Sequence, residues 1–176
     1  MEPEADDFRR RRSQGVSAPA QFDELLRRLV DADVRFVLVG GLAVNAWGVI
    51  RGTKDLDIVA DSDPANLARL AEVAESVGGQ VQGRETFAST RFGIAALLEQ
   101  GERVRIETTL GLLDVVQGLP NVPPYEELHR HAEATEVLGE KVDVCSLQDL
   151  RAMKEAAGRT RDLADLEDLD AAHGEG

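Results

Sequence analysis

Two aspartates, Asp55 and Asp57, stand one residue apart in the otherwise apolar segment DLDIVA. In a β-strand, residues two apart point to the same face and lie roughly 6 to 7 Å apart, so these carboxylates would project together. Like charges on a half-buried face repel each other, and such pairs persist beside a hard divalent cation, usually Mg²⁺, or in contact with bulk water. Two such ions can clamp the attacking and leaving oxygens of a phosphoryl displacement. The pattern therefore indicates metal-dependent phosphoryl chemistry, or else a solvated strand face.

Two glycines, Gly40 and Gly41, follow the apolar run FVLV and precede a segment that can form only a short helix before Gly48. Without side chains, their backbone N–H groups and the start of that helix could approach a phosphate chain. The alternative is a tight turn from strand to helix, which explains one glycine more easily than two. We expect a phosphate-binding turn near the two aspartates.

The surrounding segments alternate between strand and helix patterns, and they must position these residues. In chain order we expect a helix from residue 21, strands over 34–41 and 53–61, a helix over 64–78, strands over 103–111 and 112–119 with a turn at Gly111, a helix over 123–132, a hairpin over 135–146 that turns at Gly139, and helices over 147–158 and 160–173. Asp63 and Ser146 are the expected N-caps of two helices, and residues 80–103 show no clear pattern. This order predicts an α/β (α+β) fold, with a small mixed β-sheet flanked by helices and with C-terminal helices.

Composition favours a single globular domain. The 176 residues can bury one core, and we expect residues 20–173 to form one domain behind a disordered tail over residues 1–19. A net charge of −13 should repel nucleic-acid phosphates, so any contact with nucleic acid must be local. Cys145 is the single cysteine, so no intramolecular disulfide can form, and no Cys/His spacing suits zinc. With no segment apolar enough to span a membrane, we expect a cytoplasmic protein without a membrane partner.

The motif VGG, a spacer of 13 residues and DLDI together resemble the signature of the nucleotidyltransferase superfamily that includes DNA polymerase β. Within that superfamily, GGLAVNAWGVIRGTKDLDIV resembles small bacterial proteins grouped with abortive-infection nucleotidyltransferase toxins. The segments LDVVQGLPNVPPYEEL and SLQDLRAMKEAAGRTRDLADLEDL extend the similarity over most of residues 34–170. Trp47 stands where relatives often have histidine, and we expect it to fill the core.

The resemblance implies a third carboxylate on a neighbouring strand, and two residues qualify. Asp114 in GLLDVV and Glu107 in VRIETT both stand among apolar residues at strand spacing. Similarity around LGLLDVVQGLPNVPPYEEL favours Asp114, with Glu107 as the alternative. The resemblance implies that Asp55, Asp57 and Asp114 bind two Mg²⁺ and that Asp114 helps to deprotonate the acceptor hydroxyl.

Two glycines and four cations are the candidates for holding the triphosphate of an NTP. These nucleotide-binding candidates are Gly40, Gly41, Arg51, Lys54, Lys154 and Arg159. The glycines would seat the triphosphate, and the cations would neutralise its charge. The alternative for Arg51 and Lys54 is an ordinary place on the surface. The alternative for Lys154 and Arg159 is to pair with nearby aspartates of the last helix.

The predicted function is that of a Mg²⁺-dependent nucleotidyltransferase, which moves a nucleoside monophosphate from an NTP to an acceptor hydroxyl on RNA or protein. The resemblance implies the toxin of a toxin–antitoxin or phage-defence system, and hence a cognate antitoxin. One alternative is a non-catalytic module of the same fold that binds a nucleotide or a partner protein. Another is a helix-rich interaction protein whose acidic residues only increase its solubility.

Overall fold

A computed structural model of the chain describes residues 20–81 and 89–176, so the expected tail over residues 1–19 lies outside the described residues. The strands are β1 (Phe36–Val39), β2 (Asp55–Ala60), β3 (Gln80–Val81), β4 (Val104–Thr108), β5 (Gly111–Val115), β6 (Glu133–Val137) and β7 (Glu140–Val144). The helices are α2 (Phe22–Asp31), α3 (Gly40–Ala46), α4 (Pro64–Ser76), α5 (Arg91–Glu99), α6 (Tyr125–His131), α7 (Leu147–Ala157) and α8 (Thr160–His173).

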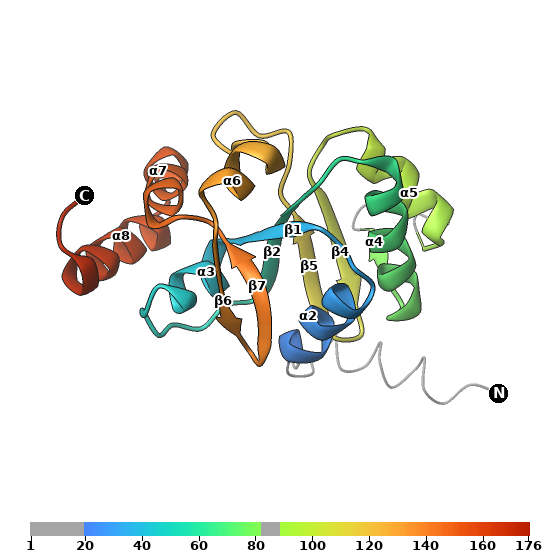
Figure 1. The fold of residues 1–176 in the computed structure, drawn as a ribbon, viewed down its shortest axis with the longest axis horizontal. Coiled ribbons are helices and arrows are strands. Elements are labelled where there is room, and N and C mark those ends of the chain that lie inside the picture. Colours follow the sequence, from blue (N-terminus) through green and yellow to red (C-terminus); the bar gives the residue numbers. More distant parts are fainter. Residues whose placement is uncertain (1–19, 82–88) are drawn as a thin grey trace.

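The described strands form one sheet in the order β3-β4-β5-β2-β1-β7-β6. At its centre β2 pairs antiparallel with β1 and parallel with β5, and β1 pairs parallel with β7. The antiparallel hairpins β4–β5 and β6–β7 extend the sheet on its two sides. Figure 1 shows α4 beside α5 at one end of the molecule, and α7 with α8 at the other. The expected mixed sheet flanked by helices, with C-terminal helices, is confirmed.

Apolar side chains of α2 and the central strands form the core. The leucines of α2 are fully buried, and all four residues of β1 are buried, as expected for a strand covered on both faces. Complete burial of one leucine stabilises a fold by roughly 1.5 to 3 kcal/mol. The apolar period of α2 therefore attaches this helix to the sheet that carries the two aspartates.

The turn between β4 and β5 differs from the expectation. Thr108 pairs with Gly111, so the turn is made by Thr109 and Leu110, and Gly111 is the first residue of β5. Gly111 has a φ of 125°, and a Cβ at this position would lie 2.8 Å from the Phe22 ring. The glycine is therefore required by packing against α2 as well as by its backbone conformation.

Ser146 and Asp63 are the N-cap residues of α7 and α4, as expected, but only Ser146 caps its helix with its side chain. The Ser146 hydroxyl accepts a 3.0 Å hydrogen bond from the Asp149 N–H at the start of α7. Asp63 precedes α4 but makes no side-chain cap, and its carboxylate lies 3.4 Å from Arg35 instead. Helix α5 forms in the stretch that showed no clear pattern, and the Thr90 hydroxyl caps it by accepting from the Gly93 N–H.

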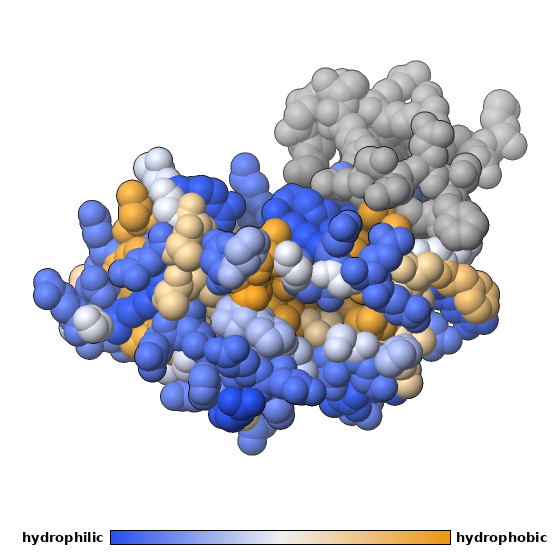
Figure 2. Space-filling view, turned by 90° about the horizontal axis from the view of Figure 1, so that it is seen from above, coloured by the Kyte–Doolittle hydropathy of each residue, from blue (hydrophilic) through white to orange (hydrophobic). Residues whose placement is uncertain are grey.

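The molecular surface is mostly hydrophilic in the view of Figure 2, where hydrophobic residues form small patches. In the described parts of the chain, none of the helices combines the length and the apolar character that crossing a membrane requires.

Candidate active site

Strands β2 and β5 bring the three predicted carboxylates together. Asp55 and Asp57 project from one face of β2, whereas Leu56 and Ile58 are buried on the other. In the parallel pair β2–β5, Asp57 stands opposite Asp114. One carboxylate oxygen from each aspartate lies within 4.8 Å of those of the other two. The three side chains can therefore contribute ligands to one metal ion.

The register of β4 against β5 separates the two candidates for the third carboxylate. Asp114 stands opposite Arg105, and Glu107 stands two residues further along β4, opposite Leu112. Among the described residues, the group of carboxylates that could share a metal contains Asp114 and does not contain Glu107. Asp114 is therefore the third carboxylate of the cluster.

The clustering of these carboxylates has an electrostatic cost. Burial, together with the neighbouring charges of Asp114 and Asp55, raises the pKa of Asp57 to about 7, while the charges of Lys154 and Arg103 oppose the shift. A divalent cation among the three would offset their repulsion. Carboxylate oxygens are the hard ligands that Mg²⁺ prefers, so the donor set fits Mg²⁺.

Two arginines that the sequence analysis missed face the cluster. Arg103 donates from Nε to Asp114 Oδ1 at 3.0 Å and from Nη2 to Asp114 Oδ2 at 2.5 Å. Arg105 lies 3.6 Å from Asp114 Oδ2 and 3.9 Å from Asp55 Oδ2. The signal was present in the segment RVRI, where both arginines alternate with apolar residues and so share one face of a strand.

Gly40 leaves space for the carboxylate of Asp57, and Gly41 leaves space for the loop before β2. Gly40 is the first residue of α3 with a φ of 67°, and a Cβ there would lie 2.0 Å from Asp57 Oδ2. A Cβ on Gly41 would lie 2.6 Å from Thr53 Oγ1. Each glycine therefore admits a different neighbour, which explains why the turn contains two.

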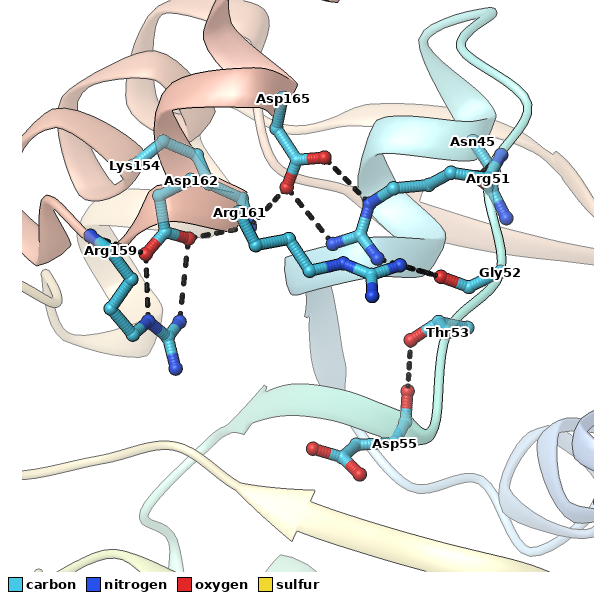
Figure 3. A network of polar contacts seen from close by, with 10 residues as sticks. All are labelled: Asn45, Arg51, Gly52, Thr53, Asp55, Lys154, Arg159, Arg161, Asp162 and Asp165. Carbon is cyan, nitrogen blue, oxygen red and sulfur yellow. Dashed lines mark hydrogen bonds and ion pairs between the residues drawn. The ribbon is translucent and has the colours of Figure 1, made fainter.

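Ion pairs to two buried aspartates, Asp162 and Asp165, join α7, α8 and the loop before β2 (Figure 3). Lys154 Nζ lies 3.0 Å from Asp162 Oδ1 and 2.9 Å from Asp165 Oδ2. Arg159 Nε lies 2.7 Å from Asp162 Oδ2, and Arg51 Nε lies 2.7 Å from Asp165 Oδ1. The pairing with aspartates of the last helix, considered as the alternative for Lys154 and Arg159, is therefore present.

Two adjoining hollows share six lining residues, which are Gly40, Asp55, Asp57, Lys154, Arg159 and Asp162. The first, of about 230 Å³, is lined by all six nucleotide-binding candidates together with Arg161. Lys54 is exposed at its rim, whereas Lys154 is buried. The second, of about 220 Å³, adds Asp114, Arg103 and apolar side chains of α7 and of residues 116–122. The first hollow is therefore lined by five cations and three carboxylates, and the second combines the third carboxylate of the cluster with an apolar wall.

Trp47 is partly buried and packs against the core, whereas the expectation was that it fills the core. Its indole N–H donates a 3.0 Å hydrogen bond to the Cys145 carbonyl, and its ring packs against the core. Its own carbonyl contacts the His173 ring at the end of α8. Trp47 therefore contacts both the end of β7 and the end of α8 from its position after α3.

Residues 24–175 match the model of the family described as nucleotidyl transferase AbiEii toxin, Type IV TA system. The chain belongs to this family.

Solved structures of two antibiotic-modifying proteins share the fold. The antibiotic-resistance factor ANT(2'')-Ia is 14% identical, with a TM-score of 0.57 over 85% of this chain and 83% of that chain. The lincosamide antibiotic adenylyltransferase LnuA is 16% identical, with a TM-score of 0.56 over 86% of this chain and 96% of that chain. No curated protein sequence matches. The protein is a nucleotidyltransferase, and the resemblance drawn from its motifs is confirmed.

The pKa of Asp57 predicts how the stability of the nucleotidyltransferase depends on pH. Folding raises this pKa from 3.8 to about 7. The protonated carboxyl of Asp57 therefore stabilises the fold below pH 4, and this contribution to the free energy of unfolding is lost as the pH rises through 7. Without metal the loss is at most about 4 kcal/mol in the free energy of unfolding. Asp57→Asn should remove this loss of stability, because the amide carries no charge at any of these pH values. The metal-free variant should then be more stable than the wild type at pH 7.5. Urea unfolding with a chelator at several pH values measures this, and parallel profiles for the two proteins would contradict it.

Replacing Gly40 should disturb the cluster, whereas replacing Gly48 should not. Both residues have positive φ, 67° and 94°, but a Cβ on Gly48 meets nothing within 4 Å. Alanine at either position costs about 1 to 2 kcal/mol of backbone strain. We expect Mg²⁺ to raise the melting temperature of the wild type, and only Gly40→Ala, which must also displace Asp57, should lose this rise. Melting curves with Mg²⁺ and with a chelator test this, and an equal response in both variants would contradict it.

Proposed function

We propose that the protein transfers a nucleoside monophosphate from an NTP to an acceptor hydroxyl in a Mg²⁺-dependent reaction. The observation that carries this proposal is the cluster of Asp55, Asp57 and Asp114, within 4.8 Å of one another beside a hollow lined by cations. When bound, Mg²⁺ would supply positive charge against the phosphate being transferred and its leaving group. Membership of the family supports nucleotidyl transfer, and the donor set supports the metal dependence.

The cationic hollow would hold the triphosphate. Gly40 and Gly41 would form its floor, and its cations would face the phosphate oxygens. These cations are Arg51, Lys54, Lys154, Arg159 and Arg161. Because aspartates of α8 already hold three of them in place, the array needs little reorganisation to receive a polyanion. The pairing with aspartates and the binding of phosphate are therefore compatible roles.

The second hollow would receive the acceptor. In an in-line displacement the nucleophile enters opposite the leaving group, so a pyrophosphate in the cationic hollow places the acceptor on the other side of Asp55 and Asp57. Asp114 lines only this second hollow, where it would take the proton of the acceptor hydroxyl. The acceptor is a hydroxyl of RNA or of a protein, and the net charge of −13 would confine contact with RNA to the neighbourhood of the site.

The family description supports a biological role as the toxin of a type IV toxin–antitoxin system, with a cognate antitoxin as partner. Induced expression in a bacterial host tests this role. The wild type should arrest growth, and Asp57→Asn, produced at the same level, should not. Equal growth of both cultures would contradict a toxin role that depends on nucleotidyl transfer.

A transfer assay tests the chemistry. Labelled NTPs are incubated with Mg²⁺ and either total RNA or total protein, and label in the acceptor is measured. Asp57→Asn and Asp114→Asn should each reduce transfer by at least about 10³-fold, because each removes charge that acts on the transferred phosphate. The matched control is Glu107→Gln, which removes a carboxylate outside the cluster and should retain activity within about twofold. Binding of NTP without transfer to either acceptor would contradict the proposal and support the non-catalytic alternative.

Lys54 offers a test of the cationic hollow that leaves the fold intact. It is exposed and lines the hollow, so Lys54→Gln should raise the KM for the NTP about three- to tenfold, with stability unchanged within about 0.5 kcal/mol. Lys141→Gln is the control, because Lys141 is an exposed lysine on β7 that does not line the hollow. Steady-state kinetics of both variants give the comparison. A KM shift shared by the two variants would indicate a general charge effect and would contradict a local phosphate contact.

A further inference from the structure

Both carboxylate oxygens of Asp114 accept hydrogen bonds from Arg103, at 3.0 and 2.5 Å. The Asp114 side chain is only 1% exposed, whereas that of Arg103 is 37% exposed. A bidentate pair between a guanidinium and a carboxylate is among the strongest ion pairs in proteins. The carboxylate that completes the metal cluster is therefore already occupied by a cation of the chain itself.

The antiparallel register of β4 and β5 produces this contact. Arg105 stands directly opposite Asp114, and Arg103 lies two residues earlier, on the same face of its strand. Arg105 remains 3.6 Å from Asp114 Oδ2, so a cation would stay beside Asp114 if Arg103 moved away. The buried carboxylate thus keeps one charged neighbour in either case.

A metal ion shared by the three aspartates must compete with Arg103. Such an ion needs an oxygen of Asp114, and a guanidinium bound to both oxygens repels a divalent cation at the same place. The backbone of Asp114 cannot move to avoid the conflict, because it lies within β5 between β2 and β4. Arg103 precedes β4 and lies partly in solvent at the rim of the second hollow, so its side chain can leave.

We propose that Arg103 is a positioning residue that holds Asp114 in the metal-free enzyme and is displaced from it when the metal binds. This inference rests on the proposed function, because it concerns the same metal cluster. Arg103 stabilises the three carboxylates by compensating charge, and it lowers the affinity of the cluster for a metal alone. The negative charge of an incoming triphosphate would then favour loading of the metal together with the NTP.

The test is titration of the full-length protein with Mg²⁺ alone by isothermal titration calorimetry, at fixed ionic strength and without nucleotide. Arg103→Gln should bind Mg²⁺ about 5- to 20-fold more tightly than the wild type, because no ion pair has to be broken. Arg103→Lys keeps the charge without the bidentate contact, so its affinity should fall between the two. Arg27→Gln is the matched control, since it removes an arginine of α2 that lines neither hollow, and it should bind Mg²⁺ as the wild type does.

The outcomes separate this inference from the proposed function. Equal or weaker Mg²⁺ binding by folded Arg103→Gln would overturn the displacement and leave nucleotidyl transfer untouched, because a merely structural Arg103 would support the metal site. If Arg103→Gln does not fold, the comparison is made between Arg103→Lys and the wild type. Tighter Mg²⁺ binding by Arg103→Lys supports the displacement, and equal or weaker binding overturns it. If neither the wild type nor any variant binds Mg²⁺ without nucleotide, this inference fails, whereas the proposed function is decided separately by the transfer assay with Mg²⁺ and NTP.

Discussion

Repulsion among Asp55, Asp57 and Asp114 is the constraint around which the site is arranged. The parallel pairing of β2 with β5 brings Asp57 opposite Asp114, and the alternation of β2 adds Asp55 on the same face. No local change of conformation can relieve the repulsion, because the sheet holds all three backbones. The charge is compensated instead by Arg103, directly before β4, and by Arg105 within β4.

A second group of buried charges explains the position of the C-terminal helices. Lys154 lies between Asp162 and Asp165, and all three are almost fully buried. Removing one member of such a group leaves an uncompensated charge and costs roughly 3 to 5 kcal/mol. Asp165 also holds Arg51, so the ion pairs that join α7 to α8 extend to the loop before β2 (Figure 3). Acidic residues of α8 therefore act as structural partners of the cations that face the first hollow.

The distribution of charge matters more here than its total. A protein with a net charge of −13 repels polyanions over most of its surface, but five cations line one hollow beside the cluster. The proposed triphosphate site is therefore a local concentration of cations on a protein whose total charge is negative. The two antibiotic-modifying proteins share the fold at 14% and 16% identity, so this arrangement of strands and helices persists across large changes of sequence.

The sequence by itself determined features that depend on short-range periodicity and local conformation. The alternation of a strand places Asp55 and Asp57 on one face, the helical spacing of leucines identifies α2, and Ser146 caps α7, because each involves residues within a few positions of one another. The motif around these residues also identified the family.

Only the tertiary structure decided between residues with the same local pattern. Asp114 and Glu107 both occupy strand positions among apolar residues, and their difference is the register of β4 against β5, which no periodicity reveals. Likewise Arg103 binds Asp114, 11 residues away, through the pairing of two strands. Lys154 binds Asp162, 8 residues away, through the packing of two helices. The sequence specifies neither contact. The second glycine of the turn is explained only by Thr53, which the fold brings against it. These features depend on which segments become neighbours in space, and that is decided by the packing of the whole core and not by any one segment.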